Sequence, residues 1–233
     1  MEQQPLEQAL ALADTQPGER VLDLSGLAGS LALRVAGTAG SVESVQSSDD
    51  LAEEGRRLAS TLGLNNLFFH AGSSRALPFD AGQFSLVLWC RGLSQEPQPL
   101  AVLDEIRRVL APRGRFVLQE ITAFGIPHLD LKLWELERRR AAGHLLFYQA
   151  EEIRSLVIMS GLEVVRTESS TLTQDFDYWA DATRLTPAER AGMKQTFFSL
   201  PPEHQDLIDL AFADGSISFG YPVTTVLIGS RRA

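Results

Sequence analysis

The part of the sequence best suited to chemistry is the loop at residues 23–29, which reads Asp-Leu-Ser-Gly-Leu-Ala-Gly. An apolar run leads into it and an amphipathic stretch follows it, so we expect a strand, a tight turn and a helix. In parallel sheets, loop amides and a helix N-terminus at the carboxyl end of a strand form the usual ligand crevice. The loop therefore predicts a site for a nucleotide-bearing cofactor. A plain strand-to-helix connection is the alternative interpretation.

The elements that must position this loop follow from the alternation of short apolar runs with amphipathic stretches between Val21 and Glu120. Such alternation is typical of parallel strands joined by crossover helices, with both faces of the sheet covered. The helix before the last of these strands should end at Pro112 and Gly114. We expect strands at residues 21–24, 41–45, 66–70, 84–90 and 114–120.

Beyond Glu120 the pattern changes and becomes more helical. Charged amphipathic stretches predict helices at residues 129–143 and 151–161, and a strand should follow at 162–169. The last stretch, residues 216–232, contains two apolar runs that each follow turn residues. This arrangement predicts a closing pair of strands.

A capping box indicates a helical insertion before those closing strands. Thr186 begins the sequence Thr-Pro-Ala-Glu-Arg, in which the Thr side chain can accept from first-turn amides while Glu189 reaches back. This helix should run to about Leu200, and another should begin near Glu203. We expect a single domain over residues 1–233, with an N-terminal helix at 1–17 and lid or insertion segments at about 123–150 and 172–214.

Two further motifs follow the loop in a fixed order. The first reads Ala-Leu-Pro-Phe-Asp-Ala-Gly-Gln-Phe and begins at Ala76, and the second occupies residues 100–120. With these motifs the chain resembles class I S-adenosylmethionine-dependent methyltransferases over about residues 18–170, especially the ubiquinone- and menaquinone-biosynthesis group with a methyltransferase type 11 domain. The resemblance implies an α/β fold with a doubly wound, Rossmann-like sheet of seven strands, mostly parallel with an antiparallel last strand. It also implies S-adenosylmethionine as the cofactor.

The first loop departs from the pattern of that family, which is Asp-x-Gly-x-Gly-x-Gly. Asp23 and Gly29 match the pattern, while Ser25 and Leu27 replace glycines. Glycine allows positive φ and a close approach of the backbone to the ligand, and a side chain obstructs both. We therefore expect a degenerate loop, in which Leu27 lies where the methionine part of the cofactor would pass.

Two other cofactor positions also carry changed residue types. Gln46 replaces the acid that accepts both ribose hydroxyls, which costs about 1–2 kcal/mol of charge-assisted bonding. Asp49 and Asp50 could supply an acid after a register shift, but they are better placed to begin the next helix. Ser73 replaces the Asp that contacts adenine. The cofactor-binding residues implied by the resemblance are Asp23, Ser25, Gly26, Gly29, Gln46, Ser47, Ser73, Ser74 and Arg91.

Methyl transfer from a sulfonium needs mainly a linear approach of the acceptor, and a base helps only when the acceptor must lose a proton. His144 is the candidate base or acceptor-positioning group because its unperturbed pKa lies near neutrality. A histidine bonded at a helix end is the alternative. Glu120 could equally cap the segment that follows it, and Ser94 stands where relatives often carry histidine. The candidate catalytic residues are His144, Glu120 and Tyr148.

The composition argues against several other functions. The 21 basic and 30 acidic residues give a formal charge of −9, so the basic footprint of a nucleic-acid-binding protein is missing. No run approaches the roughly 18 apolar residues of a membrane span, and we expect a soluble, cytoplasmic protein. Cys90 is the only cysteine and the four histidines are scattered, so we expect no metal site and a buried, inert thiol.

Aromatic residues of the second half could line a pocket for an apolar or aromatic small-molecule acceptor, or form a core between lid helices. The lid helices could also mediate a homo- or hetero-oligomer. The basic run at residues 138–140 either grips an acidic group or forms a solvated helix face. The aromatic residues concerned are Trp134, Trp179, Phe197, Phe198 and Tyr221.

Three hypotheses for function follow from these observations. The intact order of motifs favours a small-molecule methyltransferase that uses S-adenosylmethionine with a weakened site. The coincident changes at Ser25, Leu27, Gln46 and Ser73 favour a methyltransferase-like protein that no longer methylates and acts as a partner subunit or binding module. The third hypothesis keeps the fold and uses the pocket for other chemistry, such as a cyclisation.

Overall fold

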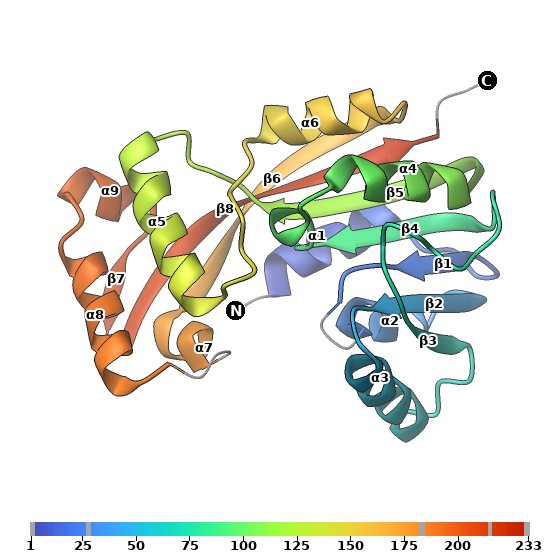
Figure 1. Cartoon of the computed structure of the whole chain (residues 1–233), viewed down its shortest axis with the longest axis horizontal. Coiled ribbons are helices and arrows are strands. Elements are labelled where there is room, and N and C mark those ends of the chain that lie inside the picture. Colours follow the sequence, from blue (N-terminus) through green and yellow to red (C-terminus); the bar gives the residue numbers. More distant parts are fainter. Residues whose placement is uncertain (1–2, 27–28, 182–184, 214–215, 231–233) are drawn as a thin grey trace.

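One continuous eight-stranded sheet organises the chain (Figure 1). The computed structural model describes residues 3–26, 29–181, 185–213 and 216–230. The strands follow the order β3-β2-β1-β4-β5-β8-β6, and β7 pairs with β8. Strands β1 to β5 run parallel, and β8 pairs antiparallel with both β5 and β6. The strands are β1 (Arg20–Asp23), β2 (Ser41–Gln46), β3 (Leu67–Ala71), β4 (Phe84–Cys90), β5 (Leu110–Ile121), β6 (Glu163–Asp175), β7 (Ala211–Ala213) and β8 (Ser216–Gly229).

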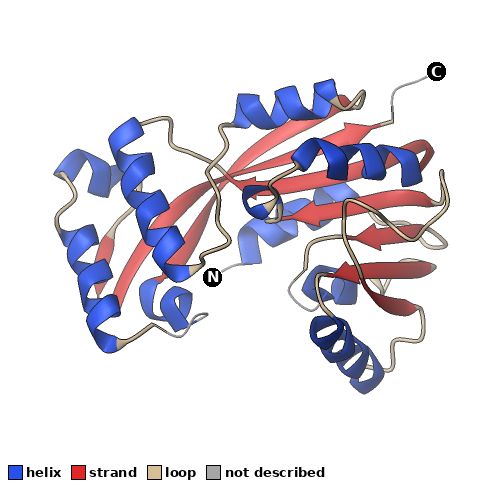
Figure 2. Cartoon of the chain, viewed as in Figure 1, coloured by secondary structure: helices blue, strands red, loops and turns tan. Residues whose placement is uncertain are grey.

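Helices cover both faces of the sheet, which explains why its strands are so uniformly apolar (Figure 2). On one face, α1, α2 and α3 enclose a core with alternate residues of β1 and β4. On the other face, α4 and α6 pack against β4, β5 and β8. These helices are α1 (Gln3–Ala13), α2 (Ser30–Val35), α3 (Asp49–Thr61), α4 (Pro99–Val109) and α6 (Ala150–Met159).

A third core lies beyond the end of the parallel strands, where β6 and β8 extend past their neighbours (Figure 1). Helices α5, α7 and α8 pack around this extension, and α9 follows them at the same end of the molecule. We call these four helices with the extension of β6 and β8 the lid. Its helices are α5 (Pro127–Arg140), α7 (Phe176–Asp181), α8 (Pro187–Phe198) and α9 (Pro202–Leu207).

The predicted fold class is confirmed, with corrections in the second half. The sheet has an eighth strand, β7, which pairs with β8. The predicted closing pair of strands is wrong, because β8 runs without a break from Ser216 to Gly229 and Gly220 and Pro222 lie inside it. Residues 172–175, placed in the insertion, belong to β6, which pairs with β8 along its whole length. Long strand pairing thus overrode the local turn signals of glycine and proline.

Helix boundaries follow the capping signals closely. Ser48 caps α3, whose first turn holds Asp49 and Asp50, so both acids begin a helix as expected. Thr186 and Glu189 form the predicted capping box of α8. Several helices end before their predicted limits, among them α1 at Ala13 rather than at residue 17, α4 at Val109 ahead of Pro112, and α5 at Arg140 rather than at residue 143. Within the described residues, none of the helices has the length and apolar character needed to cross a membrane.

Candidate functional site

The loop after β1 is held by the buried carboxylate of Asp23, at the carboxyl edge of the parallel strands. Its Oδ1 accepts from the backbone N–H of Ser25 (2.9 Å), and its Oδ2 accepts from the hydroxyl of Ser44 on β2 (3.3 Å). Asp23 is fully buried, and this burial raises the pKa of its carboxyl above the usual value, against the effect of its hydrogen bonds. Asp23 therefore fixes the start of the loop and its distance from β2.

Ser25 supports the same loop from the side of β4. Its hydroxyl accepts from the backbone N–H of Cys90 (2.9 Å), and its backbone is not among those with positive φ. A serine is therefore tolerated here without strain, and its hydroxyl is engaged with the end of β4. Cys90 is buried, and burial raises the pKa of its thiol to about 12, so this cysteine remains protonated.

The two described glycines of the loop have different functions. Both have positive φ, +68° at Gly26 and +73° at Gly29. A Cβ added at Gly29 would come within 2.4 Å of the Phe69 ring, so this glycine allows close packing. A Cβ at Gly26 would meet nothing within 4 Å, so this backbone faces open space. Leu27, predicted to obstruct the cofactor, lies outside the described residues.

Gln46 is the last residue of β2, and only one of the two polar groups of its side chain makes a hydrogen bond within the described residues. Its Nε2 donates to Ser44 Oγ (2.8 Å), which in turn bonds Asp23, so the three side chains form a chain of hydrogen bonds. The Oε1 of Gln46 is buried and accepts no hydrogen bond within the described part of the chain. A buried acceptor without a hydrogen bond costs the folded state about 1–3 kcal/mol. A hydrogen-bond donor on a bound ligand would remove this cost.

The loop after β3 lies beside Gln46, because the backbone N–H of Gly72 donates to the Gln46 carbonyl (2.9 Å). Ser73 is exposed, and its hydroxyl accepts from the backbone N–H of Arg75 (3.2 Å). Ser74 is half-buried and Ser47 is exposed. The structure therefore brings these serines to the same edge as Gln46, while their roles toward a cofactor stay predictions.

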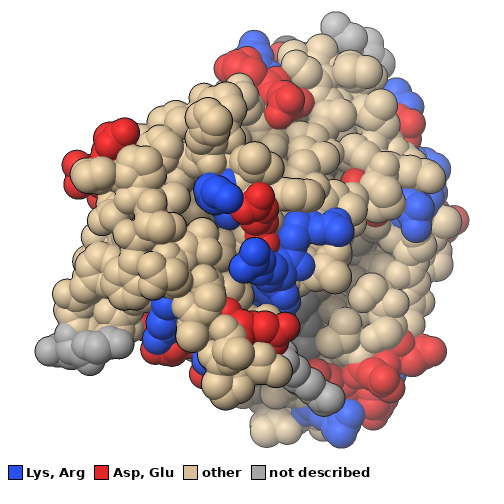
Figure 3. Space-filling view, turned by 60° about the vertical axis from the view of Figure 1, so that its left-hand side comes forward, with Lys and Arg blue, Asp and Glu red and all other residues tan. Residues whose placement is uncertain are grey.

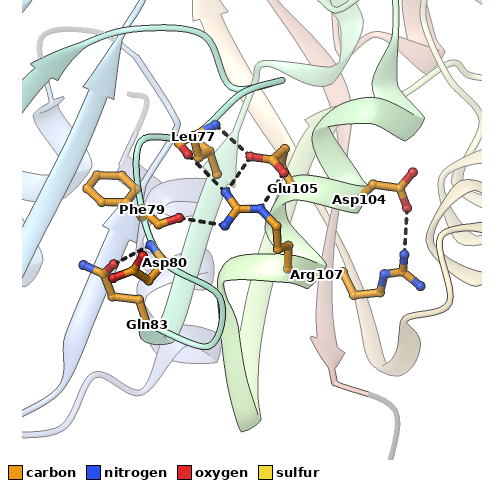
Figure 4. Close-up of polar contacts among 8 residues, drawn as sticks. Leu77, Phe79, Asp80, Gln83, Asp104, Glu105 and Arg107 are labelled. Atoms are coloured by element: carbon orange, nitrogen blue, oxygen red, sulfur yellow. Dashed lines mark hydrogen bonds and ion pairs between the residues drawn. The ribbon is translucent and has the colours of Figure 1, made fainter.

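Two charged residues of α4 form hydrogen bonds with the backbone of the motif that begins at Ala76 (Figure 4). The carboxylate of Glu105 accepts from the backbone N–H of Leu77 (2.8 Å). Arg108, which also pairs with Glu105, donates to the carbonyls of Phe79 (2.7 Å) and Leu77 (3.1 Å). Residues of α4, which belongs to the second motif, thus hold the connection between β3 and β4 that contains the first motif.

Glu120, near the end of β5, holds the turn after β4 in place. The turn is η2 (Leu93–Gln95), and the Glu120 carboxylate accepts from Ser94 N–H (3.0 Å), Ser94 Oγ (3.4 Å) and Ile121 N–H (2.9 Å). Burial raises the pKa of Glu120 to about 7, although those bonds and the charge of Arg91 oppose the shift. Of these contacts only the bond to Ile121 lies in the segment that follows Glu120; the others hold η2, which precedes it in the chain.

The segment at residues 141–149 connects α5 to α6 and brings the other two catalytic candidates to this turn. Leu145 N–H donates to the Ser94 carbonyl (2.8 Å), which places His144 beside η2. Tyr148 is half-buried, and its pKa is raised by burial and by the nearby carboxylate of Glu120. The 141–149 segment thus brings the backbone beside His144 to η2 and the Tyr148 phenol near Glu120, while the catalytic roles of these three residues stay predictions.

His144 is held in a cluster that sequence reasoning missed. Its side chain is 6% exposed, burial lowers its pKa, and its Nε2 has no hydrogen-bond partner within the described residues. Glu137 on α5 is also buried; it accepts from Arg140 (2.7 Å) and from Trp179 Nε1 (3.1 Å). Nothing in the local sequence distinguished Glu137: Arg140 is its neighbour on the same helix, but Trp179 meets it only when α7 packs near α5.

The aromatic and basic residues of the lid divide into buried and surface groups. Trp179, Phe197 and Tyr221 belong to the lid core, whereas Phe198 is half exposed. Trp134 is half-buried and donates to the Leu145 carbonyl (2.8 Å). The first and third arginines of the run at residues 138–140 lie over Trp134 and Trp179, so a purely solvated face does not describe this run. Figure 3 shows basic side chains gathered near the middle of one face, with acidic ones close by.

Together, the doubly wound sheet, its antiparallel final strands and the Asp-led loop at its carboxyl edge define the Rossmann-like methyltransferase class. Within that class, the chain belongs to the ubiE/COQ5 methyltransferase family, whose model matches residues 7–160. This result confirms the family indicated by the sequence motifs.

Individual relatives agree with this assignment. A demethylmenaquinone methyltransferase of Clavibacter sepedonicus is 34% identical over 177 residues, which cover 75% of this chain and 64% of that protein. The chain therefore spans just under two thirds of the length of this relative. A crystal structure of a candidate methyltransferase from Bacillus halodurans has a TM-score of 0.89, 20% identity and coverage of 97% of this chain and 99% of that one. The YcgJ protein of Bacillus subtilis has a TM-score of 0.87 and 21% identity, with coverage of 98% and 99%.

Proposed function

We propose that this protein is an S-adenosylmethionine-dependent methyltransferase that acts on a small molecule and binds its cofactor with reduced affinity. The observation that carries the proposal is the orphaned Oε1 of Gln46 at the end of β2, next to a loop whose Gly26 faces open space. An amide oxygen accepts hydrogen bonds, so it suits a ribose hydroxyl as donor. Family membership supports the same reading.

The residues at this edge fit the cofactor. Gln46 would accept one ribose hydroxyl, Gly26 would allow close approach of the loop, and Asp23 keeps the loop in place without being exposed. When bound, S-adenosylmethionine supplies a methyl group on a sulfonium, which is reactive toward a nucleophile in line with it. By analogy with the family, Ser73 and Ser74 would lie on the adenine side of the cofactor.

The residues around η2 would position the methyl acceptor and take up the proton that it loses. His144 is neutral near pH 7 because burial lowers its pKa, so its ring can take a proton from an acceptor. Glu120 fixes η2 through Ser94 and acts as a positioning residue. Tyr148, near Glu120, adds a phenol that remains protonated because its pKa is raised.

Titration calorimetry with S-adenosylmethionine and S-adenosylhomocysteine tests this proposal. We expect saturable binding, weakened about fivefold to tenfold by Gln46→Met, because this change removes one neutral hydrogen bond of about 1 kcal/mol at nearly constant length. Asn66→Ser, a change of an amide remote from the edge, is the control and should leave affinity unaltered. The absence of binding at millimolar ligand would overturn the proposal and favour a methyltransferase-like binding protein.

A further inference from the structure

Two buried polar atoms, Nε2 of His144 and the hydroxyl of Tyr221, make no hydrogen bond of normal geometry within the described residues, although the Tyr221 hydroxyl lies near the carboxylate of Glu137. Tyr221 is 1% exposed and His144 is 6% exposed, so bulk water does not satisfy either atom. Each orphaned group costs about 1–3 kcal/mol. Folded proteins rarely leave such groups unpaired without a ligand, an ordered water or a functional reason.

Both rings contact the same side chain, Phe147. Its ring centroid lies 4.5 Å from that of His144 and 5.7 Å from that of Tyr221. Phe147 is more exposed than either neighbour and sits in the connecting segment between α5 and α6, outside any helix or strand. It is therefore the member of the trio that can move aside with the least disruption of the core.

The position of this trio is fixed from the edge of the sheet that holds the cofactor candidates. Leu145, which follows His144, is bonded by its N–H to Ser94 of η2 and by its carbonyl to Trp134 of α5. Ser94 is in turn bonded to Glu120. A contiguous set of hydrogen bonds thus links the end of β5 to the segment that carries His144 and Phe147.

We propose that His144 Nε2 and the Tyr221 hydroxyl form a subsite for an uncharged hydroxyl or carbonyl oxygen of the methyl acceptor, whose ring or chain takes the place of Phe147. This inference rests on the proposed function only in identifying the bound molecule as the methyl acceptor. The two orphaned atoms would then each gain a hydrogen bond. The Phe147 ring would give up contacts that the acceptor restores.

The charges around the subsite select against anionic ligands. The carboxylate of Glu137 is a neighbour of both groups: it raises the pKa of the Tyr221 hydroxyl, which can turn toward it when the subsite is empty, and it opposes the lowering of the His144 pKa by burial. Its own negative charge is matched by Arg140, which is bonded to it and lies over the Trp179 ring. Arg138, whose charge also reaches His144, donates to the His144 carbonyl (3.4 Å) and lies over the Trp134 ring. A carboxylate or phosphate would nevertheless carry its charge beside the buried carboxylate of Glu137, whereas a neutral oxygen would not.

A pair of probes that differ by one hydroxyl, phenol and benzene, tests the subsite directly. Their dissociation constants are measured by protein-observed NMR in the native chain, in Tyr221→Phe and in His144→Leu. We expect the ratio of phenol to benzene dissociation constants to rise about fivefold to tenfold in each variant, which corresponds to one lost hydrogen bond. Tyr178→Phe and His128→Leu, at exposed positions, are matched controls and should not move the ratio.

An unchanged ratio in both variants, or no binding of phenol by the native chain, would overturn the subsite. Preference for benzoate over phenol would also overturn it, because the subsite would then accept a carboxylate. A purely structural role of the Tyr221 hydroxyl would alter stability but not the ratio. Calorimetry with S-adenosylmethionine on the same variants separates the two proposals, since hydroxyl-dependent phenol binding without cofactor binding would refute methyl transfer and leave the subsite standing.

Discussion

The carboxyl edge of the parallel strands and the lid satisfy buried polar groups in different ways. At the edge, Asp23, Ser44 and Gln46 are bonded in series, and residues close in sequence supply several of the contacts. In the lid, Glu137 depends on Trp179, which is 42 positions away in the chain. The comparison teaches that the edge depends largely on contacts between residues close in sequence, whereas the lid depends on contacts between segments far apart in the chain.

The strongest test of this contrast is Glu137→Gln. The change leaves Arg140, a largely buried cation, without its charged partner, so we expect a loss of roughly 3–5 kcal/mol in the free energy of unfolding. Chemical denaturation measures this loss. Glu135→Gln, on the same helix and in the exposed pair with Lys132, should cost less than about 1 kcal/mol. Equal effects of the two changes would show that the lid cluster is not a buried network.

Glu120, which lies between the two regions, predicts a pH dependence of stability. The pKa of its carboxyl is about 7 in the folded chain, against 4.5 for an unperturbed glutamate in the unfolded chain, so its contribution is fully present below pH 4.5. That contribution, about 3 kcal/mol, is lost as the pH rises from about 4.5 to about 7. Glu120→Gln should flatten the stability profile over this interval, as measured by denaturation at a series of pH values. A profile that keeps its slope would contradict the assigned cause.

Arg108→Met tests how firmly α4 fixes the connection between β3 and β4 at the edge. The change removes the bonds to the carbonyls of Leu77 and Phe79 and the pair with Glu105, and we expect a cost of about 2 kcal/mol. The neighbouring Arg107 is more exposed and pairs with Asp104 at 3.4 Å, so Arg107→Met is the matched control, expected within about 0.5 kcal/mol of the native chain. Denaturation by urea decides whether the two arginines differ.

The smallest expected effect on stability, and the sharpest on binding, comes from Gly26→Ala. Its backbone has φ of +68° with open space around the new Cβ, so strain alone should cost about 1–2 kcal/mol. Gly63→Ala has the same φ and the same open space far from the edge, and should destabilise the chain equally. Only Gly26→Ala should also weaken the binding of S-adenosylmethionine, as measured by titration calorimetry. Equal affinities in the two variants would remove Gly26 from the cofactor site.

Much of the edge was predictable because each of its features is encoded locally. The apolar runs specified β1 to β4 within about one residue, and Ser48 with its acidic neighbours began α3 as a capping residue should. Asp23 was placed at the end of β1 by the same reasoning. What this reasoning could not decide is where the hydroxyl of Ser25 points, because Cys90, its partner, is 65 positions away.

The sequence by itself therefore determined the family, the order of strands and helices in the first half, and the residues that meet at the carboxyl edge, because helix caps and strand periodicity are properties of neighbouring residues. Only the tertiary structure decided that β8 is one strand through Gly220 and Pro222, and that Glu137, His144 and Tyr221 share one buried cluster. These outcomes depend on which distant segments pack together, and the free energy of that packing exceeds the local preference of any single residue.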